Sequence, residues 1–199
     1  RCNFTNLNIV PAAFLSQNPK FALSALKRFS QWDVIDMLSR AGIAWHEKTL
    51  GQLFCDGSAK QIVALLTGQM AKGGVDLQLG VTIGAVRRDA AGFRVTVNTG
   101  LVRADAVVVA SGGKSIPKMG ASGLGYQLAA EFGLPLVETR PGLVPLTFAP
   151  RDLAQLAPLA GLSVEASVSC NKARFQEGLL FTHRGLSGPS ILQISSYWR

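Results

Sequence analysis

The sequence has few of the residues that build disulfide frameworks and zinc sites. Its 199 residues include three cysteines and two histidines. Cys2, Cys55 and Cys170 are widely spaced, with no Cys-x-x-Cys pair and no cysteine–histidine cluster at zinc spacing. The sequence therefore predicts no metal site and no disulfide framework, and a reducing cytoplasm as the location of the protein.

Long hydrophobic runs are also lacking, although 48% of the residues are hydrophobic. A membrane-spanning helix needs about 20 consecutive apolar residues, and no run approaches that length. The chain opens with Arg-Cys-Asn instead of a basic and then apolar leader. We therefore expect no membrane span and no signal peptide. Because the chain does not begin with Met, we expect an internal piece of a longer protein.

Charged residues are sparse, at 16% of the chain, but their net charge is +8. A basic chain raises the question of nucleic-acid binding. However, the segments that end at residues 50, 100, 150 and 199 carry net charges of +3, +2, +1 and +2, so the charge is spread evenly. No basic stripe is interleaved with aromatic side chains. The even spread of charge disfavours nucleic acid as a partner, and the sequence leaves the oligomeric state open.

The most informative stretch is residues 104–126. Residues 106–110 form a continuous apolar run rich in valine, which predicts a parallel strand buried on both faces. Ser111-Gly112-Gly113 follows at once. Ligands of open α/β sheets bind at the carboxyl ends of strands, and glycine lets the backbone approach them closely. A tight turn without a ligand is the alternative.

Three motifs resemble the signatures of one family. Residues 107–120, Val-Val-Val-Ala-Ser-Gly-Gly-Lys-Ser-Ile-Pro-Lys-Met-Gly, are similar to (V/I)-(I/V)-A-T-G-G-x-S-x-P-x-x-G, with Ser111 in place of the usual threonine. Residues 1–6, Arg-Cys-Asn-Phe-Thr-Asn, resemble the end of G-G-G-R-C-N-x-T-N, and residues 178–189 resemble L-L-F-T-H-x-G-L-S-G-P. Together they resemble the BaiN/RdsA-like (YhiN-type) flavoproteins, which are NAD(P)/FAD-dependent oxidoreductases.

The resemblance implies an α/β fold. Residues 1–142 would be a partial FAD/NAD(P)-binding Rossmann-like domain that lacks its N-terminal βαβ unit and carries a small antiparallel meander. Residues 143–199 would begin a β-rich insert or substrate domain. The implied function is transfer of a hydride to or from a small organic substrate, with FAD as cofactor and NADH or NADPH as electron donor. A non-catalytic module that binds nucleic acid or protein is the alternative.

The resemblance also places specific residues against the cofactor. Residues 1–6, which by their chemistry alone would form a capped turn in a linker-like opening, would lie beside the flavin. Ile83 would offer its backbone to the adenine. The expected cofactor-binding residues are Arg1, Cys2, Asn3, Thr5, Asn6, Ile83, Ala110, Ser111, Gly112 and Gly113. Because the pyrophosphate fingerprint is absent from the sequence, we expect the 199-residue chain alone to bind FAD weakly or not at all.

His183 is the candidate proton donor or substrate contact, because the resemblance places its loop at the active-site cleft. Arg184 beside it is a second candidate for a substrate contact. The resemblance also makes residues 46–55 a wall of the substrate site. From the residues alone, His46 reads as a structural histidine, since no partner at metal spacing lies near it.

Two weaker signals point elsewhere. Gly123-Leu124-Gly125 at a helix start resembles half of a phosphate-binding turn, but it lacks the third glycine, and we favour a flexible helix entry. Ser187 near His183 suggests a serine nucleophile. The segment at 185–189 ends in proline instead of the glycine of a nucleophile elbow, which disfavours a hydrolase.

Periodicity and capping residues predict the remaining elements. Helices are expected after the N-caps Ser30 and Ser58, at 123–132 and at 189–197. Short strands are expected at 43–48, 51–55, 75–79, 81–88, 92–98, 101–103, 134–137, 161–169, 173–175 and 178–181.

Overall fold

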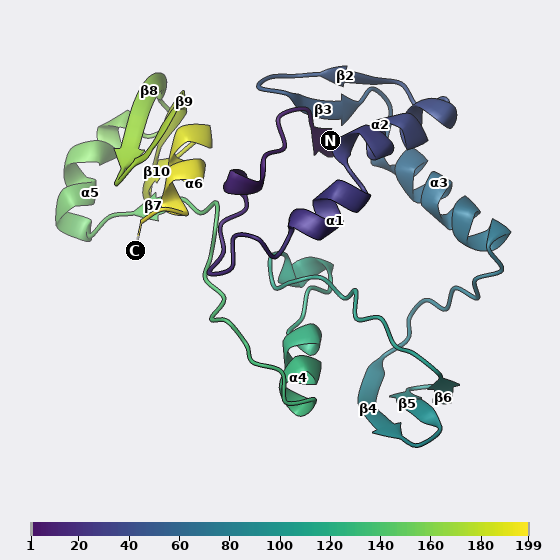
Figure 1. Ribbon diagram of the computed structural model, residues 1–199. Coiled ribbons are helices and arrows are strands. Elements are labelled where there is room, and N and C mark those ends of the chain that lie inside the picture. Colours follow the sequence, from purple (N-terminus) through teal and green to yellow (C-terminus); the bar gives the residue numbers. More distant parts are fainter. Residues whose placement is uncertain (1, 199) are drawn as a thin grey trace. The chain divides into compact units, whose positions relative to one another are not determined.

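The computed structural model describes residues 2–198, apart from the side chain of Met119. The chain divides into two compact units, Arg1–Val108 and Val109–Arg199. Both units combine helices with antiparallel sheets (Figure 1). The domain boundary expected between residues 142 and 143 concerns the domains of the whole protein, and it stays a prediction.

The first unit contains a three-stranded sheet in the order β1-β3-β2. A 3-10 turn, η1, follows the first strand, and the β2–β3 hairpin lies between helices α2 and α3. The elements are β1 (Asn3–Asn6), η1 (Pro11–Ala13), α1 (Leu23–Arg28), α2 (Gln31–Arg40), β2 (Trp45–Glu47), β3 (Gln52–Cys55) and α3 (Ala59–Lys72).

Helices α2 and α3 begin where the sequence predicts. At α2 the Ser30 hydroxyl accepts from the Asp33 N–H at 3.4 Å, and the Asp33 carboxylate accepts from the Ser30 N–H at 2.7 Å. Ser58 and Gln61 form the same capping box at α3. The hydrogen bonds from Ser30, that of its hydroxyl foremost, lower the pKa of the Asp33 carboxyl. Its charge therefore persists at the helix N-terminus, where the dipole favours it.

The core of the first unit lies between α2 and the β1-β3-β2 sheet. Leu38 of α2 is completely buried, and it packs with Ile43 and Cys55. Phe4 of β1 and Val34 of α2 pack against this cluster. The apolar side of α2 therefore faces the sheet.

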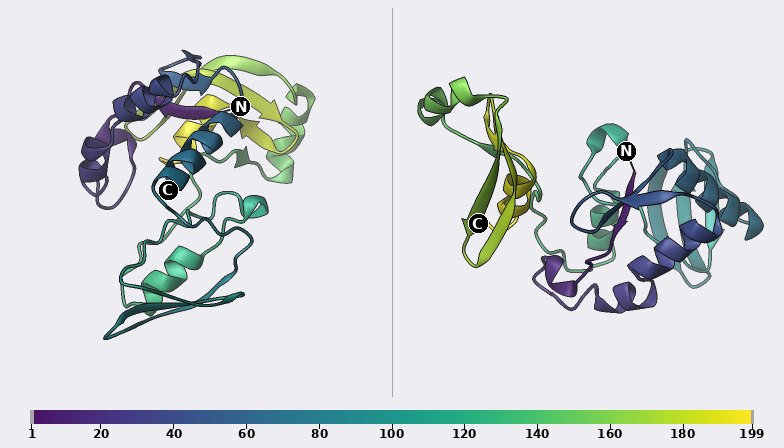
Figure 2. Two further views of the ribbon diagram at one scale, coloured as in Figure 1. Left: turned by 90° about the vertical axis from the view of Figure 1, so that its right-hand side faces the viewer. Right: turned by 90° about the horizontal axis from the view of Figure 1, so that it is seen from above.

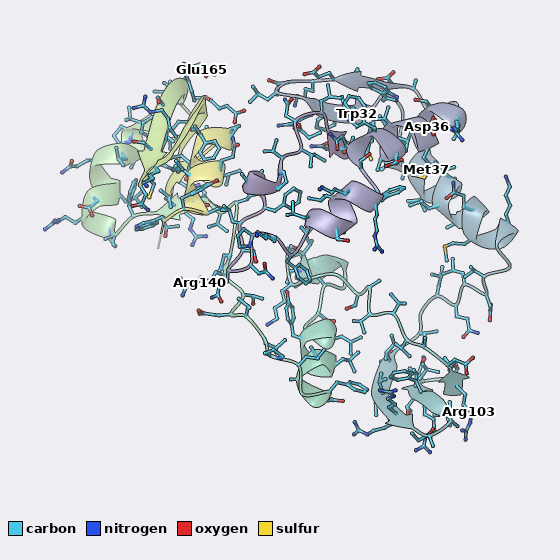
Figure 3. The ribbon with its side chains drawn as sticks, in the orientation of Figure 1. Trp32, Asp36, Met37, Arg103, Arg140 and Glu165 are labelled. Atoms are coloured by element: carbon cyan, nitrogen blue, oxygen red, sulfur yellow. The ribbon has the colours of Figure 1, made fainter. Side chains whose placement is uncertain are left out.

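The rest of the first unit is the antiparallel meander that the sequence predicts. It consists of β4 (Ile83–Asp89), β5 (Gly92–Val97) and β6 (Gly100–Ala104), in that order. Val86 is buried on one face. Arg87 of β4, Arg94 of β5 and Arg103 of β6 lie in register on the exposed face, and Figure 3 labels Arg103.

The second unit contains a four-stranded sheet in the order β7-β10-β9-β8. Helix α6 packs along β8 and β9 (Figure 2). Its Ile191 and Ile194 side chains are buried. The strands expected at 173–175 and 178–181 form one strand, β9. The elements are η2 (Pro117–Met119), α4 (Leu124–Glu131), β7 (Leu146–Thr147), α5 (Pro150–Leu156), η3 (Ala157–Leu159), β8 (Ser163–Cys170), β9 (Ala173–Thr182), β10 (Gly185–Ser187) and α6 (Pro189–Ser195).

Four expectations about strands are wrong. Residues 75–79, 106–110 and 134–137 are outside every strand, and Val108 is 87% exposed. A strand needs a neighbour to satisfy its backbone hydrogen bonds, and among residues 2–198 no segment pairs with these three runs. Conversely, residues 3–6 were expected to be a capped turn but form β1, because β3 pairs with them.

The burial of Leu38 generates the first prediction. We expect Leu38→Ala to lower the free energy of unfolding by about 2–5 kcal/mol, because it leaves a cavity between α2 and the sheet. Val63→Ala on α3 is the control, since Val63 is 59% exposed, and its effect should stay within about 0.5 kcal/mol. Urea unfolding measures both. Equal decreases in the free energy of unfolding of the two variants would contradict a core centred on α2.

Candidate cofactor-binding site

Residues 110–113 form an exposed loop after the valine run. Gly112 has φ of 73°, a left-handed conformation that favours glycine, and open space surrounds the position of a Cβ there. Within the described part of the chain, the amide groups of residues 111–113 donate to no protein acceptor. Free amide donors on a backbone without obstructing side chains suit the oxygen atoms of a phosphate, a ribose or a flavin edge.

The first turn of α4 supports this loop. A Cβ on Gly125 would lie 3.3 Å from the Ser111 Oγ and 3.5 Å from the Val109 Cγ1, so the glycine permits close packing. The Lys114 ammonium lies 5.2 Å from the centroid of the Tyr126 ring, a cation–π contact. Close packing therefore explains the glycine at position 125 without a bound phosphate. This agrees with the flexible helix entry that the sequence favours over a phosphate-binding turn.

Cys2 and Asn3 line a cavity of about 560 Å³ at the beginning of β1. Its other walls are mostly apolar side chains, among them Met37 of α2, which Figure 3 labels. Cys2 is half-buried and Asn3 is exposed. The Asn3 and Thr5 side chains form no hydrogen bond within the described residues, so both keep polar groups available for a ligand.

Asn6 differs from these neighbours because its amide is used within the protein. Its Nδ2 donates to the Leu50 carbonyl at 3.1 Å, and its Oδ1 accepts from the Asn8 N–H at 2.7 Å. These bonds hold the turn between β2 and β3, in which Leu50 has a positive φ of 50°. Arg1 lies outside the described residues. For all these residues, contact with a cofactor stays a prediction.

Ile83 begins β4, which is an edge strand of the meander. The Asn98 N–H donates to the Thr82 carbonyl at 3.1 Å, and Ile83 faces Val97 in the ladder. In an antiparallel ladder this arrangement makes Ile83 and Val97 a non-hydrogen-bonded pair. The N–H and C=O of Ile83 therefore point away from the sheet, as a backbone contact to an adenine requires.

His183 is exposed in the turn between β9 and β10. Its ring has no hydrogen-bond or ion-pair partner among residues 2–198. A hydrogen bond fixes the turn itself, because the Arg184 N–H donates to the Thr182 Oγ1 at 3.2 Å. Ser187 lies in β10 opposite Leu180. A catalytic triad needs a carboxylate that orients the histidine, and the described residues provide none for His183.

The hairpin of β2 and β3 uses its polar side chains within itself. His46 Nδ1 lies 2.5 Å from the Asp56 Oδ1, and its ring stacks on Phe54. The Glu47 Oε1 accepts from the Gly51 N–H at 2.9 Å. His46 is thus held by a carboxylate, as the residue-based reading of a structural histidine expects. Cys55 at the end of β3 lies opposite Cys2. The spacing of the cysteines in the sequence could not have shown this pairing.

Comparison with known proteins agrees with the motifs. The model of the HI0933-like protein Rossmann domain matches residues 1–188. A "Ribosomal RNA dihydrouridine synthase" of Escherichia coli is 52% identical over 100% of this chain and 50% of its own length. A protein of the same name from Haemophilus influenzae is 44% identical, with the same coverage of each chain. A "3-dehydro-bile acid delta(4,6)-reductase" of Clostridium scindens is 28% identical over 99% of this chain and 49% of its own length.

The chain spans about half the length of the curated relatives that it matches. All three relatives are enzymes by name. The helices that the structure describes include none long and apolar enough to cross a membrane. The α/β fold class and the family that the three motifs indicate are confirmed, since the family model extends from the first motif into the third. The chain belongs to the HI0933-like family of Rossmann-domain proteins.

Proposed function

We propose that the chain is part of an FAD-dependent reductase that adds hydrogen across a carbon–carbon double bond in a uridine of ribosomal RNA. The loop at 110–113 carries the proposal, because its free amides and left-handed Gly112 fit a cofactor edge. The relatives support the reaction class. Dihydrouridine is uridine with its ring double bond saturated, and the bile-acid enzyme is named a reductase.

The described residues fit FAD at three separate positions. The amides of residues 111–113 would donate to oxygen atoms of the cofactor, and Ser111 adds a hydroxyl. Asn3 and Thr5 have unused polar groups on β1. The outward backbone groups of Ile83 would pair with the adenine edge. Bound FAD would supply the hydride chemistry, with NADH or NADPH as the electron donor.

His183 would provide the proton of the reaction. Saturating a double bond with a hydride also consumes one proton, which a positioned acid can deliver to the second carbon. Histidine is the side chain that most often serves as a general acid. The ring of His183 is exposed and has no partner among the described residues, so it is available to a substrate.

Ribosomal RNA replaces the small organic substrate that the resemblance implies. The two relatives named for ribosomal RNA are 52% and 44% identical, whereas the bile-acid reductase is 28% identical. The net charge of +8 suits a polyanionic partner. From the even spread of that charge we expected no nucleic-acid partner. The proposal does not adopt that expectation.

The test is the visible absorbance spectrum of the full-length protein, followed by anaerobic addition of NADH or NADPH. We expect flavin bands that one nicotinamide bleaches and that unmodified ribosomal RNA restores. Restoration by a conjugated steroid ketone but not by RNA would assign a small-molecule substrate. A colourless protein that takes up no added FAD would refute the cofactor, and RNA binding with steep salt dependence would then indicate a non-catalytic module.

Gly112 offers a direct test of the cofactor loop. Gly112 and Gly74 have φ of 73° and 72°, and neither has an atom within 4 Å of the position of a Cβ. Alanine strains the backbone at both positions by about 1–2 kcal/mol. We expect Gly112→Ala to reduce FAD affinity at least about tenfold, because its methyl group would occupy the open space through which the cofactor reaches the backbone amides, and Gly74→Ala to leave it unchanged. Flavin fluorescence titration measures both, and equal affinities would place the cofactor elsewhere.

His183→Gln tests the proton donor. We expect kcat to fall by about 100-fold, the lower range for loss of a general acid, while the flavin is still reduced at the normal rate by the nicotinamide. Lys172→Gln is the control, because Lys172 is exposed in the turn between β8 and β9 of the same sheet. Single-turnover kinetics separate the two half-reactions. If turnover is unchanged in His183→Gln, the role of His183 as proton donor is refuted.

A further inference from the structure

Cys2 and Cys55 lie opposite each other on β1 and β3. Asn3 pairs with Phe54 in the ladder, which makes Cys2 and Cys55 the next opposed residues, and the Cys55 N–H donates to the Cys2 carbonyl at 3.1 Å. Cα atoms of opposed residues joined by such bonds are about 5.5 Å apart. Disulfides span Cα separations of about 4.4–6.8 Å, so the Cα separation expected for this pair falls within their range.

The two thiols have different environments. Cys2 is half-buried and lines the cavity of about 560 Å³ at the start of β1, so it is the more accessible residue of the pair. Cys55 is 7% exposed and belongs to the core cluster with Leu38. Burial, and then the neighbouring Cys2 thiol, raise the pKa of Cys55. Cys2 is therefore the thiol that meets an external reagent first, and Cys55 is the one that reacts with Cys2.

We propose that Cys2 and Cys55 are a site of reversible oxidation by peroxides. The Cys2 thiolate attacks the O–O bond of hydrogen peroxide and becomes a sulfenic acid, and the other peroxide oxygen leaves as water once protonated. The Cys55 sulfur then attacks the Cys2 sulfur, which forms the S–S bond and releases the second water. The two thiols lose two electrons and two protons, and the peroxide is reduced to two waters. A dithiol reductant restores both thiols.

Proximity makes the second step fast. The opposed strands hold the two sulfurs together, which converts the reaction between them into an intramolecular one. Cys170 has no such neighbour: it lies on β8 opposite Ala173, and its Sγ is 3.6 Å from the Tyr197 carbonyl. The inference concerns thiols of this chain alone, and it holds whichever substrate the protein uses.

The experiment treats the full-length protein with hydrogen peroxide, blocks the remaining thiols with N-ethylmaleimide and maps peptides by mass spectrometry without reductant. We expect one cross-linked peptide pair that contains Cys2 and Cys55, lighter by two hydrogens and cleaved by dithiothreitol. Cys170→Ser is the matched control and should give the same pair. A Cys2–Cys55 pair that never appears, or a pair that contains Cys170 instead, would overturn the proposal.

Two further variants separate the roles of the thiols. In Cys55→Ser, we expect Cys2 to accumulate as a sulfenic acid that dimedone traps. In Cys2→Ser, Cys55 should stay unmodified at the same peroxide concentration, because it is buried. Oxidation of Cys55 in that variant as fast as Cys2 in the wild type would contradict the order of steps. If either serine variant fails to fold, the cross-link in the wild type and in Cys170→Ser decides the question.

Discussion

Pairing of β1 with β3 is the contact on which the first unit depends. It converts residues 3–6 from a polar opening into a strand, and it brings Cys2 beside Cys55. The same pairing places Asn6 where its amide holds the turn between β2 and β3. The ladder places Asn3, Thr5 and Asn6 of β1 opposite Phe54, Leu53 and Gln52 of β3, with a register shift between Asn3 and Thr5. Asn3 and Thr5 keep free polar groups next to a firmly held backbone.

A second constraint is the need of every strand for a neighbour. The valine run at 106–110 has the composition of a buried parallel strand, yet Val108 is 87% exposed. The chain spans about half the length of its curated relatives, and we expect the rest of the protein to supply strands on both sides of this run. Its exposed apolar surface is consistent with that expectation. The Gly112 loop would then lie at the carboxyl end of a buried strand, where ligands of such sheets bind.

The candidate cofactor-binding residues in each unit offer backbone groups and side chains that carry little charge. The amides of residues 111–113, the outward groups of Ile83 and the amide of Asn3 can all donate or accept hydrogen bonds to a cofactor without placing a formal charge beside it. Such a setting leaves the redox chemistry to the cofactor and its orientation to the protein. His183, exposed in its turn, is the proposed proton donor.

Local patterns in the sequence predicted helices α2, α3, α4 and α6 and the hairpins, but they did not predict α1 or α5. Ser30 and Ser58 cap α2 and α3 through bonds within one turn, and the meander of β4, β5 and β6 closes through tight turns, so both can be read from neighbouring residues. The motifs likewise identified the family and the loop at 110–113. Tertiary structure decided what depends on distant segments: that residues 3–6 pair with β3, that the valine run has no partner here, and that Cys2 meets Cys55. Hydrogen bonds between strands join residues that are far apart in the chain, and no local pattern specifies which segments meet.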